Sequence, residues 1–123
     1  MAAVERDVPG AVIATIYKIA PETLWREAVE QGAFTGSPVD VKDGFIHFST
    51  AAQVQATAAR HFAGAADLVL VAIATAGLDL RWEPSRGGDL FPHLYDALPL
   101  TAVHWVKPLP LDTGGRHVFP ALA

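Results

Sequence analysis

Two short segments of the chain combine a histidine with hydroxyl or aromatic neighbours at the spacing of a β-strand. In the first segment (Phe-Ile-His-Phe-Ser), alternation along a strand places Phe45, His47 and Ser49 on one face. Thr50 and Gln53 then match a capping box, which opens a helix. A histidine and a hydroxyl beside a helix N-terminus can bind an anion or a ribose hydroxyl. The alternative is that the hydroxyl groups only cap the helix, which is the more frequent role of Ser and Thr at this position. The histidine would then be hydrogen-bonded to a neighbouring carbonyl group.

The second segment (Phe-Pro-His-Leu-Tyr) begins at Phe91 and places His93 and Tyr95 on one face. Glycines and a proline nearby allow the backbone to approach a ligand closely. Histidine and tyrosine are well suited to line a small-molecule pocket, and histidine can act as an acid or base near neutral pH. An edge strand with an ordinary aromatic and histidine is the alternative interpretation.

One acidic residue, Glu83, stands at the end of an apolar extended segment. Its carboxylate could anchor a ribose hydroxyl or stabilise a developing cation. It could equally be a surface charge beside Arg81 or Arg86, which would contribute little.

Composition excludes several classes of protein. The chain has 123 residues, 51% hydrophobic and 18% charged, no cysteine and a net charge of −4. A chain this apolar is not disordered, and one of this length fits a single domain. Without cysteine there is no disulfide scaffold and no thiolate zinc site. Histidines and carboxylates lack the spacing of a metal site, so we expect no metal. The negative charge argues against binding nucleic acid through a basic surface.

We expect neither export nor membrane insertion. The longest apolar run, residues 68–74, is far shorter than the roughly 20 residues that span a bilayer. The first ten residues carry Glu5 and Asp7, whereas a signal peptide has basic residues only. We therefore expect a cytoplasmic protein.

Hydrophobic periodicity predicts two helices and five or more strands that do not strictly alternate, a pattern typical of the α+β class. The helices are expected at residues 21–32, with Leu24, Trp25, Ala28 and Val29 buried, and at residues 50–64, with Val54, Ala58 and Phe62 buried. Strands are expected at residues 12–19, 45–49, 68–74, 78–83 and 101–106, with an irregular extended segment at 90–95 and an unstructured loop at 33–44. The domain organisation would be a flexible leader at 1–10, one domain at 11–110 and a tail at 111–123 wrapping on it.

Several segments, in order, resemble a bacterial family known as domain of unknown function 952. They are Ile-Tyr-Lys-Ile from residue 16, Trp25, the segment from Asp43 to Thr50 with Gln53, and residues 91–95 followed by Leu-Pro-Leu at 98–100. The resemblance covers residues 13–109. It implies an ADP-ribosyltransferase-like fold, a split, mixed sheet with two main helices around an NAD-type cleft.

The resemblance also implies roles for individual residues. Lys18 or Tyr17 would stand at the first-strand position, and the second strand would end in His47, Ser49 and Thr50 before a helix. The third position departs from the superfamily pattern, because His93 and Tyr95 stand there and Glu83 lies upstream. That departure puts classical ADP-ribose transfer in doubt, because a carboxylate stabilises its oxocarbenium-like transition state. The His-x-Ser pattern is also similar to the RNA 2′-phosphotransferase branch.

We therefore expect NAD or an ADP-ribosyl-type nucleotide to bind in one cleft. Lys18, Ser49, Thr50 and Tyr95 would hold the ligand, with Lys18 pairing with phosphate. His47, His93 and Glu83 would be the catalytic residues of an ADP-ribosyl- or 2′-phosphotransferase-like enzyme. The alternatives are a non-catalytic module that binds a metabolite or protein and has lost the transferase residues, and a purely structural protein.

Overall fold

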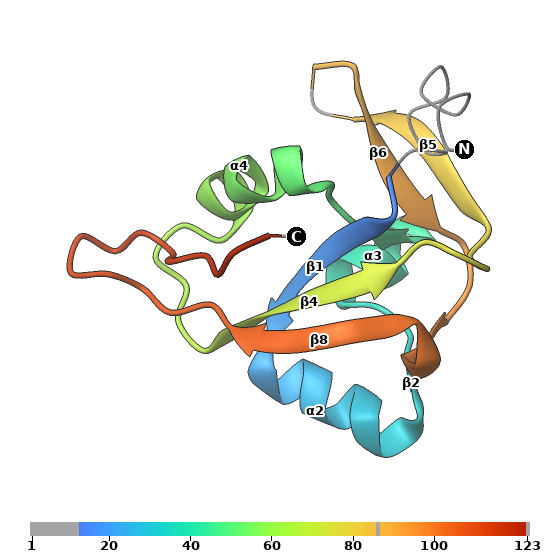
Figure 1. Ribbon diagram of the computed structural model, residues 1–123, viewed down its shortest axis with the longest axis horizontal. Helices are drawn as coiled ribbons and strands as arrows, with labels where there is room; N and C mark the ends of the chain where they lie inside the picture. Colours follow the sequence, from blue (N-terminus) through green and yellow to red (C-terminus); the bar gives the residue numbers. More distant parts are fainter. Residues whose placement is uncertain (1–12, 86, 123) are drawn as a thin grey trace.

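An antiparallel sheet lies at the centre of the computed structural model, which describes residues 13–85 and 87–122. Its strands are β1 (Thr15–Pro21), β4 (Leu68–Ala74) and β8 (Val103–Pro108), with β4 in the middle (Figure 1). As predicted, β4 is almost entirely buried, which explains its continuous apolar sequence. The expected leader at residues 1–10 lies outside the described residues.

Each face of this sheet packs against a helix of its own. On one face, Trp25 and Ala28 of α2 (Glu22–Gln31) join Ile16, Val71 and Ile73 in one buried cluster. On the other face, Val54 and Ala58 of α4 (Ala51–His61) join Tyr17, Leu70 and Ala72 in a second cluster. Both helices are where the periodicity predicts them, and Phe62 packs against the second cluster. Val29 is 54% exposed instead of buried, because α2 contacts the sheet mainly through Trp25 and Ala28.

A second antiparallel sheet, with strand order β3-β6-β5, stands beside the first. It consists of β3 (Ile46–His47), β5 (Leu80–Ser85) and β6 (Asp89–Leu94), with β6 in the centre. The strand expected at residues 45–49 is therefore shorter, and the segment predicted to be irregular is a regular central strand. Pro92 lies in this central strand; its carbonyl accepts a hydrogen bond from Phe48 N–H at 3.1 Å, but without an N–H group it donates none to the ladder.

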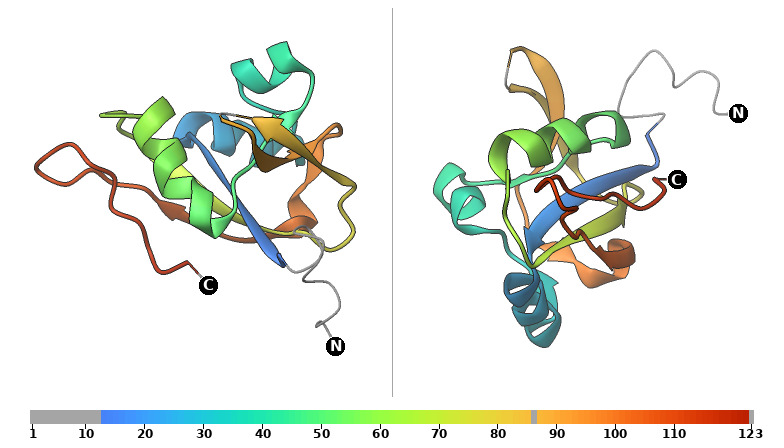
Figure 2. Two further views of the ribbon diagram at one scale, coloured as in Figure 1. Left: turned by 90° about the horizontal axis from the view of Figure 1, so that it is seen from above. Right: turned by 90° about the vertical axis from the view of Figure 1, so that its left-hand side faces the viewer.

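The segment at residues 33–44, predicted to be an unstructured loop, contains β2 (Ala33–Phe34) and α3 (Pro38–Asp43). Strand β2 pairs with β7 (Leu98–Pro99), which precedes a short 3-10 helix at Leu100–Ala102. The helix α3 has Ser37 and Asp40 as a capping box, Pro38 in its first turn and Gly44 in the left-handed conformation after its last turn. It stands apart from α2 and α4 (Figure 2).

The α+β class is confirmed, and the described residues form a single domain. The mixed sheet that the resemblance implied is not found, because every strand pair in residues 13–85 and 87–122 is antiparallel. After β8 the chain turns back toward α4 (Figure 2), where Phe119 and Leu122 pack on the second cluster. There His117 Nε2 lies 2.8 Å from the carbonyl oxygen of Ala65.

Candidate functional site

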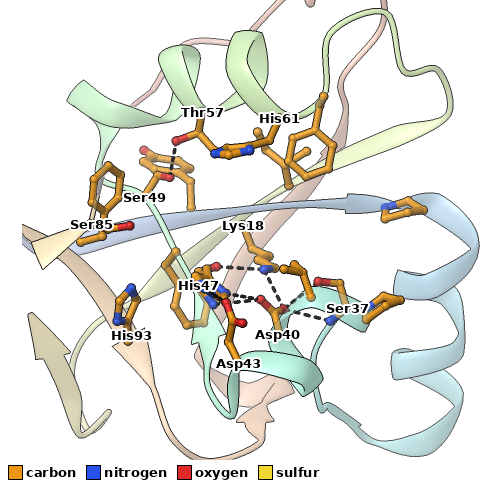
Figure 3. A pocket seen from close by; sticks show the side chains of 18 residues that line it. Lys18, Ser37, Asp40, Asp43, His47, Ser49, Thr57, His61, Ser85 and His93 are labelled. Carbon is orange, nitrogen blue, oxygen red and sulfur yellow. Dashed lines mark hydrogen bonds and ion pairs between the residues drawn. The ribbon is translucent and has the colours of Figure 1, made fainter. Parts of the chain in front are cut away.

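A cavity of about 620 Å³ lies between β1, α3, the end of β3 and α4. Its size is in the range of small-molecule binding sites, about 300–1,000 Å³. Aromatic rings of Tyr17, Phe48, Phe62 and Phe91 form much of its wall. The polar side chains in the wall are labelled in Figure 3: Lys18, Ser37, Asp40, Asp43, His47, Ser49, Thr57, His61, Ser85 and His93.

Pairing between strands brings the two histidine segments together. In the antiparallel pair of β3 and β6, His47 lies directly opposite His93, and their ring centroids are 5.3 Å apart. Just after β3, Ser49 forms an isolated bridge with Tyr17 of β1, with N···O distances of 2.8 and 2.9 Å. This bridge joins the two sheets at the cavity and places Ser49 beside the first strand.

Asp40 of α3 is the centre of a buried ionic network (Figure 3). One carboxylate oxygen lies 2.8 Å from Lys18 Nζ and accepts hydrogen bonds from the Ser37 hydroxyl and N–H. The other lies 2.6 Å from His47 Nδ1, while His47 Nε2 lies 3.0 Å from Asp43. Lys18 Nζ also donates to the carbonyl oxygen of His47 at 2.9 Å. These contacts link α3 to both β1 and β3.

Burial and charge act in opposite directions on the pKa values in this network. Burial acts to raise the pKa of Asp40, but the His47 hydrogen bond and the Lys18 charge outweigh it and hold that pKa well below its usual range. Burial lowers the pKa of the Lys18 ammonium, and the Asp40 carboxylate opposes that shift. Since the carboxylate is ionised and 2.8 Å away, we take Lys18 to be charged.

A separate group of polar side chains surrounds His93, at the Ser85 end of the cavity (Figure 3). Its Nδ1 lies 2.6 Å from Glu83, and the Tyr95 hydroxyl donates to both Glu83 oxygens at 2.8 and 3.0 Å. The hydrogen bonds from His93 and Tyr95 lower the pKa of Glu83, and the bond to Glu83 raises the pKa of Tyr95. The Phe45 ring contacts the rings of His93, His47 and Tyr95.

Two hydroxyl groups, those of Ser49 and Thr57, lie next to each other in the cavity wall. Ser49 Oγ lies 3.0 Å from Thr57 Oγ1 of α4, which also donates to the carbonyl oxygen of Gln53. The predicted capping box is confirmed, because the Gln53 side chain accepts a hydrogen bond from Thr50 N–H at 3.1 Å. Thr50 is therefore buried at the start of α4 and is not part of the cavity wall.

The structure brings most of the predicted site residues together, though not all at the cavity surface. Lys18, His47, Ser49 and His93 line the cavity. Glu83 and Tyr95 lie behind His93 and reach the cavity through its ring. His104 lies away from the cavity, exposed on β8.

Asp40 and Thr57 are polar wall residues for which the sequence suggested no role in a site. For Thr57 a signal was present, because it follows Val54 at i+3 and so lies on the same side of α4. His61 follows Val54 at i+7 and lies on that side too, although it is exposed. For Asp40 the signal was the capping box with Ser37.

Within residues 13–85 and 87–122, no three His, Asp or Glu side chains are arranged to hold a metal ion. Over the same residues, the structure has no helix with the length and apolar character needed to cross a membrane.

The fold and the site define a small antiparallel α+β protein with an ion-paired, histidine-lined cavity beside its central sheet. Residues 19–106 match the family model described as protein of unknown function (DUF952), and the chain belongs to that family. No curated protein matches the chain.

Solved structures of one relative have the same fold. The crystal structure of protein CC0527 from Caulobacter crescentus is 48% identical, covers 85% of this chain and 93% of its own, and superimposes with a TM-score of 0.80. The solution NMR structure of CC0527 is 49% identical, covers 83% of this chain and 90% of its own, and has a TM-score of 0.75. The relation supports the fold.

Proposed function

We propose that the cavity binds NAD or a related ADP-ribosyl nucleotide. The observation that carries the proposal is the composition of one cavity wall, which combines aromatic rings, the Ser49–Thr57 hydroxyl pair and two histidines held by carboxylates. Aromatic rings can stack on a base, and hydroxyls and histidines can bind the hydroxyls of a ribose. The volume of about 620 Å³ suits a ligand of this size.

Charge in the wall favours one orientation of the nucleotide. Among the described residues lining the cavity, Lys18 is the single Lys or Arg, and its ammonium is paired with Asp40. Asp43 adds a second carboxylate that is 40% exposed. A wall whose ammonium group is already paired with a carboxylate disfavours a buried pyrophosphate. We therefore place the nicotinamide-ribose end inside the cavity and the pyrophosphate at its mouth, so that Lys18 positions Asp40 rather than binding phosphate.

The order of chemical groups along the chain supports an ADP-ribosyltransferase-like fold within the same proposal. Lys18 lies on the first strand, Ser49 ends a second segment before a helix, and Glu83 lies on a later strand. In a transferase-like enzyme, the Asp43 carboxylate, which is 40% exposed, would stabilise positive charge developing on the ribose as nicotinamide leaves.

Isothermal titration with NAD, ADP-ribose and 2′-phosphorylated RNA tests the ligand class. We expect NAD or ADP-ribose to bind the wild type, and His47→Ala to weaken binding while His104→Ala, exposed on β8, leaves it unchanged. Binding of the RNA alone would favour the 2′-phosphotransferase branch. If none of the three releases or absorbs heat, the proposal is wrong.

A non-catalytic binding module is the second candidate, and one observation favours it. The Glu83 carboxylate is hydrogen-bonded to His93 and Tyr95 behind the cavity wall. It is therefore not presented to the ligand as a transferase carboxylate would be. Incubation with NAD, followed by chromatography for free nicotinamide, separates the candidates, because the module would bind NAD and release none.

A further inference from the structure

The His93 ring has one nitrogen bonded and one free. The side chain is only 4% exposed and lines the cavity. Its Nδ1 is 2.6 Å from Glu83 Oε1, whereas Nε2 is buried and has no hydrogen-bond partner within the described part of the chain. Buried polar atoms are nearly always hydrogen-bonded, so an unpaired one in a cavity wall points to a group that arrives from outside.

The neighbours of Glu83 decide which nitrogen carries the proton. The Tyr95 hydroxyl donates to both oxygens of Glu83, so the carboxyl group acts as an acceptor. The same contacts lower the pKa of Glu83, which keeps it ionised near neutral pH. An ionised carboxylate only accepts hydrogen bonds, so the short contact requires a proton on His93 Nδ1. In the neutral ring, Nε2 then carries a lone pair.

Packing holds the ring in this orientation. The Phe45 ring stacks on His93 with centroids 4.2 Å apart and planes at 28°, and His47 meets its edge. Rotating the ring to exchange its nitrogens would break the 2.6 Å contact with Glu83. Packing therefore holds Nε2 in one fixed orientation in the wall of the cavity.

We propose that His93 Nε2 is a hydrogen-bond acceptor for a hydroxyl or N–H group of the bound ligand, with Glu83 and Tyr95 as its positioning residues. A lone pair at this point repels carbonyl and phosphate oxygens and so selects a donor. For the ribosyl nucleotide of the proposed function, on which this assignment of the ligand rests, the donor is a ribose hydroxyl. The acceptor itself does not depend on that ligand.

Nitrogen NMR of the histidine rings tests the acceptor without any ligand. In the neutral imidazole ring of the wild type, we expect the two nitrogens of His93 to show the Nδ1–H tautomer. In Glu83→Gln the amide can either accept or donate, so the Nε2–H tautomer should become populated. A wild-type His93 with its proton on Nε2 would overturn the proposal.

Two substitutions at one position test the contact with the ligand. His93→Asn keeps a group able to reach Glu83 and removes Nε2, whereas His93→Gln reaches further and retains an acceptor near the Nε2 position. In titrations with ADP-ribose and NAD, we expect His93→Asn to bind about tenfold to a hundredfold more weakly, and His93→Gln to lose less. His104→Asn on β8 is the matched control and should bind as the wild type does.

The outcomes separate the two proposals. If the wild type binds neither nucleotide, the proposed function fails. The tautomer of His93 measured by nitrogen NMR then shows by itself whether Nε2 is a hydrogen-bond acceptor. If nucleotides bind the wild type and His93→Asn equally well, with both variants folded by circular dichroism, His93 is not the acceptor and the proposed function stands.

Discussion

The Asp40 carboxylate, at the scale of single residues, is the group on which the cavity wall depends most. It is 1% exposed and contacts Lys18, His47 and Ser37. Removing one partner of a buried ion pair leaves the other charge buried and uncompensated. The main cost of losing these contacts is therefore the uncompensated buried charge of Lys18, and the net energy of the ion pair itself is small.

We expect Asp40→Asn to lower the free energy of unfolding by about 3–5 kcal/mol, because the Lys18 ammonium loses its counter-charge inside the protein. Urea unfolding monitored by tryptophan fluorescence measures this. Asp43→Asn is the matched control: its carboxylate also contacts His47 but is 40% exposed, so the loss should be about 0–1 kcal/mol. Equal losses in the two variants would show that Asp40 is not the centre of the network.

The low pKa of Asp40 also predicts a pH dependence. A carboxyl whose pKa is lower in the folded than in the unfolded state stabilises the fold above its ordinary pKa, and that contribution disappears as the pH falls toward the lowered value. The difference in unfolding free energy between wild type and Asp40→Asn should therefore be full at pH 7 and shrink steadily at pH values below about 4. Urea titrations across this range measure it, and a difference that grows in acid would contradict the assignment.

At the scale of elements, the short helix α3 closes one side of the cavity and depends on a glycine before it. Gly36 has φ +116°, and a Cβ atom there would lie 2.8 Å from the Cβ of Asp40. Both the left-handed backbone and the lack of space exclude a side chain.

We expect Gly36→Ala to destabilise the protein by about 2–3 kcal/mol or more, through backbone strain and the clash with Asp40 together. Gly32→Ala, after α2, is a control that separates the two causes. Gly32 also has a positive φ, +90°, but nothing lies within 4 Å of its Cβ position. Its cost should be about 1–2 kcal/mol from strain alone. Thermal unfolding of both variants would contradict this interpretation if Gly32→Ala proved the more damaging.

At the scale of the whole molecule, the two buried clusters share the central sheet, with one on each face. Neighbouring residues of β4 point to opposite clusters, Leu70 to the α4 side and Val71 to the α2 side, and both are fully buried. The sheet therefore couples the two helices into one cooperative unit.

We expect Leu70→Ala to lower the free energy of unfolding by about 2–5 kcal/mol while the protein keeps a single transition by fluorescence and circular dichroism. Val106→Ala on β8, where the side chain is 37% exposed, is a control and should change it by less than about 0.5 kcal/mol. Two separate transitions in Leu70→Ala would show that the two faces unfold independently.

The sequence by itself determined the local elements and the candidate histidines. The buried strand β4 and the capped helix α4 follow from patterns within a few residues, namely an apolar run and the Thr50–Gln53 capping box. The two histidine segments likewise stand out by the spacing within each segment. Among the α-helices of residues 13–85 and 87–122, α3 was missed, because its six residues are too few for a hydrophobic period to show.

Only the tertiary structure decided how those residues meet. The pairing of His47 with His93, the bridge from Tyr17 to Ser49 and the ion pair of Lys18 with Asp40 join residues 22–46 positions apart, by the difference of their numbers. Alternation along a strand predicts which face a side chain occupies, but the identity and register of its partner depend on packing across the molecule. For the same reason the sequence left open whether Glu83 is a catalytic residue or a surface charge, whereas in the structure it lies behind His93 as its hydrogen-bond partner.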